Sequence, residues 1–99
     1  MIIVSKVLLE CQEDYVGLWS IIRALKDYET NDDEIMKKTM AIITELISKN
    51  GVVSGEFVNG VFEVWKIPLA EIIEKIQNNW IKIDRTPDIG EIVWFTKLP

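Results

Sequence analysis

The chain has 99 residues and a formal net charge of −5, with no histidine and one cysteine, Cys11. These counts exclude the usual zinc sites, catalytic pairs that need histidine, and an intramolecular disulfide. With 48% hydrophobic residues, the chain suits a single domain over residues 1–99. It has no uncharged apolar run of membrane-spanning length and no signal-peptide pattern, so we expect a cytoplasmic protein with no membrane contact.

Apolar side chains recur every three or four positions through residues 4–27, which predicts helix. Gly17 interrupts this stripe, and Asp14 can cap a helix that starts there. The pattern fits one long helix or two, and we favour a short helix followed by a longer one from about Asp14 to Asp27. Cys11 lies on the apolar stripe, where we expect a buried and unreactive thiol.

A second helical pattern runs from Ile35 to Lys49 after a polar connector. Thr30, Asn31 or Asp32 can cap its start, and the pair Asn50-Gly51 is a typical helix end. Residues 52–67 are then rich in β-branched and aromatic residues, with Asn59-Gly60 between two such runs. This predicts a hairpin from about Val53 to Lys66, in which Gly55 marks a bulge or an early end of the first strand.

A third helix is predicted from Pro68, with an apolar stripe that includes Ile72, Ile76 and Trp80. Gln77, Asn78 and Asn79 favour its end, residues 84–90 have loop composition, and residues 91–96 are predicted as a strand. The order is helix(-helix)-helix-hairpin-helix-strand. We expect a single small α+β domain with its helices packed on one face of a small antiparallel sheet.

The four tryptophans, Trp19, Trp65, Trp80 and Trp94, all fall on predicted apolar faces. The simplest interpretation is a tryptophan-rich core. The alternative is an exposed aromatic patch for a partner, with Trp65 and Trp94 the best candidates because their strands could be sheet edges.

Nothing in the sequence indicates catalysis. The run Asp32-Asp33-Glu34 lacks the ligand spacing of a calcium loop and fits a helix N-terminus better. Glu71 and Glu74 lie three apart on a face that looks solvated, beside Lys75. Because no phosphate-binding, nucleophile-elbow or metalloprotease motif occurs either, we expect no enzyme, no metal and no cofactor.

A winged-helix DNA-binding protein has similar ingredients, namely helices followed by a hairpin. The second and third predicted helices are separated by about 17 residues, however, whereas a helix-turn-helix needs a turn of three or four. The third helix, which would then have to contact DNA, carries a net negative charge that opposes approach to phosphates. Nucleic acid is therefore disfavoured as a partner.

The last third of the chain contains Phe62-x-x-Trp65-x-x-Pro68, then Trp80, then Pro87-Asp88-Ile89-Gly90-Glu91-Ile92-x-Trp94-Phe95. It resembles a family of small uncharacterised bacterial proteins with the C-terminal signature P-[ND]-[IL]-G-[DE]-[IV]-x-W-F. The resemblance implies no activity. Small acidic bacterial proteins of this kind include immunity proteins of toxin systems.

The sequence therefore predicts a non-catalytic, acidic protein-interaction module, such as an immunity or antitoxin-like protein that binds a basic partner. The alternatives are a divergent winged-helix regulator and a small-ligand binder with a tryptophan-lined pocket. A homodimer is a further expectation if the strand Ile92–Phe95 lies at a sheet edge. The candidate partner-binding residues are Asp32, Asp33, Glu34, Glu56, Glu63, Trp65 and Trp94.

Overall fold

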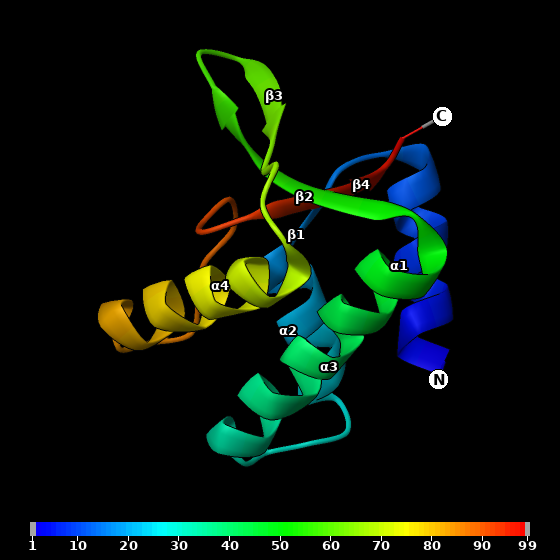
Figure 1. The fold of residues 1–99 in the computed structure, drawn as a ribbon. Coiled ribbons are helices and arrows are strands. Elements are labelled where there is room, and N and C mark those ends of the chain that lie inside the picture. The colour runs from blue at the N-terminus through cyan, green and yellow to red at the C-terminus, as the bar shows by residue number, and fades with distance from the viewer. Residues whose placement is uncertain (1, 99) are drawn as a thin grey trace.

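The computed structural model describes residues 2–98, which form four helices and one four-stranded antiparallel sheet (Figure 1). The elements are α1 (Ile2–Glu13), β1 (Val16–Gly17), α2 (Leu18–Lys26), α3 (Asp32–Asn50), β2 (Val52–Val58), β3 (Val61–Val64), α4 (Leu69–Ile83) and β4 (Trp94–Lys97). The helices pack against the sheet, which confirms the predicted α+β class. None of the helices in this described part combines the length and apolar composition that a membrane crossing requires.

Residues 2–26 form two helices separated by a short strand that the helical stripe does not predict. α1 ends at Glu13, the extended backbone of Val16 and Gly17 pairs with β4, and α2 begins directly afterwards at Leu18. The preference for two helices is confirmed, but the first, with 12 residues, is longer than the second, with 9, which is the reverse of the predicted order. The predicted start at Asp14 is wrong, because Asp14 lies outside both helices and its side chain accepts the backbone N–H of Tyr15 at 2.7 Å.

The central helix, α3, begins and ends at the residues that its capping signals indicate. The Asn31 side chain accepts the backbone N–H of Glu34 at 3.0 Å, and Gly51 ends the helix in the left-handed conformation with φ of 69°. α3 packs against all three other helices, and Ile42, Ile43 and Leu46 on it are fully buried. It therefore supplies the middle of the hydrophobic core.

α4 extends further than predicted. Its stripe of Ile72, Ile76 and Trp80 is buried as expected, but the helix continues past Gln77–Asn79 to Ile83. It ends only where Asp84 adopts the left-handed conformation with φ of 54°. The polar residues stay helical because they lie on the exposed side of a helix whose other side is held by core contacts.

The connection between α2 and α3 changes one argument from the sequence. α2 ends at Lys26 and α3 begins at Asp32, so only residues 27–31 join them. The separation of about 17 residues lies between α3 and α4. It does not separate α2 from α3, because the first helical pattern, residues 4–27, contains both α1 and α2. α2 and α3 are thus close to helix-turn-helix spacing, and α3 rather than α4 is the helix that would contact DNA.

The strands lie in the order β1-β4-β2-β3, and every neighbouring pair is antiparallel. β4 starts at Trp94, later than predicted, and lies between β1 and β2. It is therefore an interior strand, and the condition for a homodimer through the strand Ile92–Phe95 is not met. Within the described residues, the two edge strands are β1 and β3.

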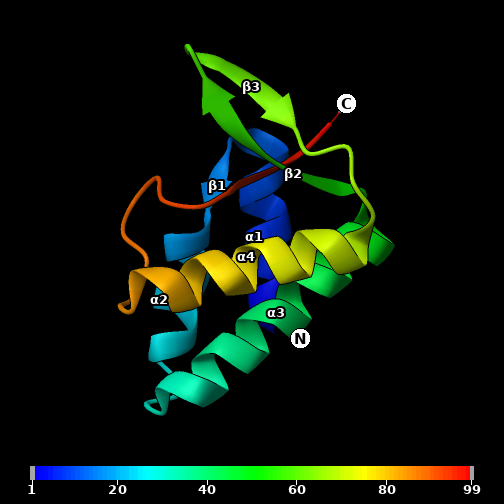
Figure 2. The same ribbon diagram turned by 60° about the vertical axis from the view of Figure 1, so that its left-hand side comes forward.

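One face of the sheet packs on the helices, and on the other face Thr96 is also buried, where its hydroxyl donates to the Cys11 carbonyl of α1 at 3.3 Å. Val16, Val52, Ser54 and Phe95 share the helix-facing side, and each of them is at most 3% exposed. The β2–β3 hairpin extends beyond the helical layer, as both ribbon views show (Figures 1 and 2). Its distal half projects past the helices, and Phe57, Val58 and Val61 there are exposed.

Gly55 lies where β2 changes partner, because it pairs with Trp94 of β4 and with Val64 of β3. A Cβ atom at this position would clash with the backbone carbonyl oxygen of Glu63. Glycine thus permits a close approach of two strands. The strand continues to Val58 rather than ending early.

Candidate protein-interaction surface

A two-residue turn sets the register of the projecting hairpin. Asn59 and Gly60 both have positive φ, of 52° and 80°, as a type I′ turn requires. The turn places Val58 opposite Val61, Phe57 opposite Phe62 and Glu56 opposite Glu63. Side chains directly opposite one another share a face of the sheet, so this register decides what each face of the hairpin presents.

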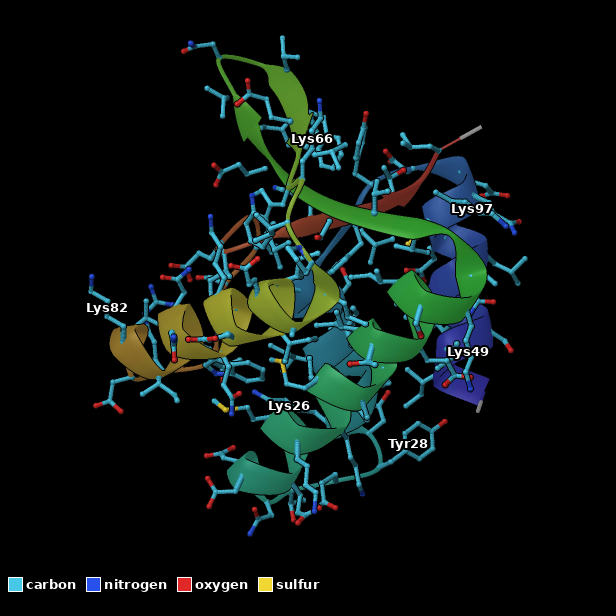
Figure 3. All side chains as sticks on the ribbon, in the orientation of Figure 1. Lys26, Tyr28, Lys49, Lys66, Lys82 and Lys97 are labelled. Atoms are coloured by element: carbon cyan, nitrogen blue, oxygen red, sulfur yellow. The ribbon has the colours of Figure 1, made fainter. Side chains whose placement is uncertain are left out.

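Glu56 and Glu63, which we call the acidic pair, are exposed and face each other across the two strands. The ion pairs of the described residues are Lys38–Glu29 and Arg85–Glu91, so neither member of the acidic pair has a cationic partner. Lys66 lies near the base of the hairpin, whereas Lys26, Lys49 and Lys82 lie on the helices, away from its tip (Figure 3). Like charges in this position destabilise a hairpin.

The tip of the hairpin, residues 57–61, has three apolar side chains that are exposed, on both faces. Val58 and Val61 are 38% and 64% exposed on the face of the acidic pair, and Phe57 is 41% exposed on the opposite face. Apolar side chains normally gain free energy by leaving water. An exposed apolar tip beside unpaired carboxylates is therefore a candidate contact surface for another protein.

On the opposite face, four rings form an aromatic cluster of Tyr15, Phe57, Phe62 and Trp94. Tyr15 lies 4.9 Å from both phenylalanine rings, and Phe57 contacts Trp94 edge-on at 5.8 Å between centroids. The cluster lies on the sheet face opposite Phe95 and Ser54, while Tyr15 remains 40% exposed. The ring contacts extend the apolar tip towards β1.

Trp65 and Trp94, the predicted aromatic anchors, are both half-buried. Trp65 packs against the core, and the Lys75 ammonium lies over its ring at 4.5 Å from the centroid. The indole of Trp94 lies beside Gly17 and Gly90, where an added Cβ atom would be 3.5 Å and 3.6 Å from the ring. The more exposed aromatic side chains near the hairpin are Tyr15 and Phe57.

The predicted acidic residues do not form one surface. Asp32, Asp33 and Glu34 occupy the first turn of α3, where their charge suits the positive end of the helix. This turn lies at the end of the molecule opposite the hairpin in both views (Figures 1 and 2). Glu56 and Glu63, by contrast, are brought together by strand pairing.

The tryptophans do not gather in one pocket. Trp80 lines a surface groove of about 260 Å³ between α3 and α4, together with Asp32 and Asp33. Trp19 lines a second groove of about 310 Å³ between α1 and α2, where the Arg23 guanidinium lies 5.2 Å from its ring centroid. Each groove therefore has one tryptophan.

Within the loop of the C-terminal signature, Arg85 and Glu91 form an ion pair. The Glu91 carboxylate accepts two hydrogen bonds from Arg85, at 2.5 and 2.7 Å, and one from the backbone N–H of Asp88 at 2.6 Å. The bonds from Arg85 and then Asp88 lower the pKa of Glu91 from 4.5 to about 2. The Glu91 N–H also donates to the Asp88 carbonyl at 3.1 Å, which closes a turn over residues 88–91.

A turn at Ile92 explains why the last strand starts later than predicted. The Val93 N–H donates back to the Glu91 carbonyl at 2.9 Å, which places Ile92 in a γ-turn with φ of 73°. Such a backbone cannot continue a strand, so pairing with β1 and β2 begins only at Trp94. The signature residues thus build a rigid loop that leads into the middle of the sheet.

The thiol of Cys11, the one cysteine, lies in the hydrophobic core. Cys11 is 1% exposed, and burial, with a smaller effect of Glu10, raises the pKa of its thiol to about 11. The predicted burial of the thiol is confirmed, and its raised pKa disfavours the reactive thiolate. No group of three or more potential metal ligands occurs among residues 2–98.

Comparison with known proteins finds no matching family model, no matching curated protein and no matching solved structure. The resemblance of the C-terminal third to a bacterial family therefore stays a prediction. The functional argument depends on the hairpin itself.

Proposed function

We propose that this chain is a non-catalytic protein-interaction module that binds a basic partner through its β2–β3 hairpin. The observation that carries the proposal is the acidic pair, Glu56 and Glu63, which is exposed and unneutralised beside an exposed apolar tip. A lysine or arginine of a partner would relieve the repulsion between the two carboxylates. Burial of Phe57, Val58 and Val61 would stabilise the complex further.

The overall charge supports the same kind of partner. The chain carries 16 acidic and 11 basic side chains, and its net charge of −5 would attract a basic protein over distance. Complementary charge raises association rates more than affinity. A basic toxin, such as a nuclease whose cationic surface binds nucleic acid, has the matching chemistry, so we include an immunity or antitoxin-like role in the proposal.

Site-specific photocrosslinking in the producing cells tests the surface. A photoreactive benzoylphenylalanine is placed at Val61 on the hairpin or at Leu9 on α1; both side chains are 64% exposed. We expect Val61 to yield an adduct of one discrete mass with a basic protein, and Leu9 to yield none. Because Leu9 is as exposed as Val61, a crosslinker at Leu9 controls for adducts that form by random collision with other proteins.

Charge reversal provides the second half of this test. Combining the Val61 crosslinker with Glu56→Lys and Glu63→Lys should abolish the adduct, because the partner's cations would then be repelled. An adduct that survives this reversal, or that forms equally at Leu9, would show that the hairpin is not the docking surface. The absence of any adduct at Val61 would count against the function itself.

A second candidate is a DNA-binding regulator, favoured by the short connection of residues 27–31 between α2 and α3 and by the hairpin that follows α3. Its weakness is charge, because the first turn of α3 carries Asp32, Asp33 and Glu34. Recognition helices contact base edges mainly through their N-terminal residues. Three carboxylates there would oppose approach to the phosphates.

A mobility-shift assay in about 50 mM salt, where phosphate contacts are strongest, decides this second candidate. If α3 contacts DNA, the double substitution of Lys37 and Lys38 by Glu should abolish the shift. We expect no shift with the unmodified protein. A shift that depends on these two lysines would favour the regulator over the interaction module.

A further inference from the structure

The outer edge of β3 has free backbone hydrogen-bonding groups. β3 is the last strand of the sheet order, and its only strand neighbour in the described chain is β2. The Trp65 N–H donates to the Ser54 carbonyl at 2.9 Å across the base of the hairpin. Antiparallel pairs alternate between bonded and non-bonded, so Val61 and Glu63 bond to β2, while Phe62 and Val64 direct their N–H and C=O groups outward.

The side chains of β3 alternate in chemistry along this edge. Glu63 lies on the face of the acidic pair, together with exposed Val61. Phe62 and Val64 lie on the opposite face, where Phe62 joins the aromatic cluster. An added strand would therefore meet a carboxylate at one position and apolar side chains at the positions on either side.

We infer that β3 receives an extended segment of the basic partner as a fifth strand of the sheet, with alternating basic and apolar side chains. This inference rests on the proposed function and specifies its binding mode. The basic side chain would lie opposite Glu63, on the far side of β3 from Glu56. The apolar side chains would lie opposite Phe62 and Val64, and their backbone groups would bond to the free edge.

A second copy of this chain does not fit the same edge. Antiparallel pairing of two β3 strands would bring Glu56 and Glu63 of both copies onto one continuous face. Four carboxylates would then lie close together without a cation. Charge thus selects a partner strand of opposite sign.

Amide hydrogen exchange measured by NMR tests the inference with a defined probe. The probe is a seven-residue peptide of alternating Lys and Val, blocked at both ends, added to the full chain. We expect exchange at the Phe62 and Val64 amides to slow about tenfold at a peptide concentration near ten times its Kd. A peptide of alternating Glu and Val should leave both amides unchanged.

Backbone methylation of the probe distinguishes strand addition from simple attraction. In an antiparallel added strand, the Val residues point their N–H groups towards β3 and the Lys residues point theirs away. N-methylation of the valines should abolish protection of the Phe62 and Val64 amides, and N-methylation of the lysines should preserve it. Equal protection by both methylated peptides, or no protection by the unmodified one, would overturn the inference.

The double variant Glu56→Gln, Glu63→Gln supplies a control for folding. It removes a repulsion and so should fold at least as well as the unmodified chain, yet bind the Lys-Val peptide at least tenfold more weakly. If crosslinking at Val61 succeeds but the Phe62 and Val64 amides gain no protection, the strand-addition mode fails and the proposed function stands. If crosslinking fails, the function fails whatever the peptide does.

Discussion

Single residues determine whether the hairpin can be built at all. Gly55 lets β2 pair on both sides, and no larger residue fits against the carbonyl of Glu63. Gly17 offers a matched comparison, because a Cβ there would meet only the Trp94 ring at an ordinary 3.5 Å, and its φ is −81°. The two glycines therefore differ in what an added methyl group contacts.

We expect Gly55→Ala to lower the free energy of unfolding by about 1–3 kcal/mol, the usual effect of overpacking. Gly17→Ala should lower it by less than about 1 kcal/mol, because its main effect is a poorer helix N-cap. Urea denaturation followed by circular dichroism measures both. Equal losses would show that strand approach at Gly55 is not the limiting contact.

The Arg85–Glu91 pair predicts a specific pH dependence of stability. The pKa of Glu91 is lowered to about 2, below its ordinary 4.5, so the pair stabilises the fold above about pH 4.5 and is lost as pH falls towards 2. Glu91→Gln should therefore reduce the drop in urea midpoint between about pH 6 and pH 3. Arg85→Gln should reduce it similarly. An unchanged drop in both variants would contradict the role of the pair.

At the scale of elements, the sequence indicates most of the helices and the hairpin but not the sheet order. α3 and the Asn59-Gly60 turn follow from local signals, and the turn alone implies that Glu56 faces Glu63. Tyr15 could not be placed in the aromatic cluster, because two residues of β1 show no periodicity. The insertion of β4 between β1 and β2 depends on long-range packing that no local pattern records.

Removing one charge of the acidic pair should stabilise the hairpin, because it removes the repulsion between the two carboxylates. We expect Glu63→Gln to raise the free energy of unfolding by about 0.2–1 kcal/mol in low salt. The gain should shrink in about 1 M salt, where charges are screened within about 3 Å. Thermal denaturation at the two salt concentrations measures it. A destabilised variant would show that Glu63 makes a favourable contact instead.

At the scale of the whole molecule, the candidate acidic residues occupy two distant sites. The first turn of α3 and the hairpin lie at opposite ends of the molecule, so they cannot contact one small partner segment together (Figure 1). The carboxylates on α3 already interact favourably with the end of their helix. Those on the hairpin have no such compensation, which is why we assign binding to them.

Calorimetric titration of the alternating Lys-Val peptide into two charge-matched variants tests this assignment most directly. Glu56→Gln with Glu63→Gln and Asp32→Asn with Asp33→Asn each remove two of the 16 carboxylates, so each changes the net charge from −5 to −3. We expect the hairpin variant to bind at least tenfold more weakly, about 1.4 kcal/mol, and the α3 variant to stay within about twofold of the unmodified chain. Equal weakening in both variants would show that only net charge matters and would contradict docking at the hairpin.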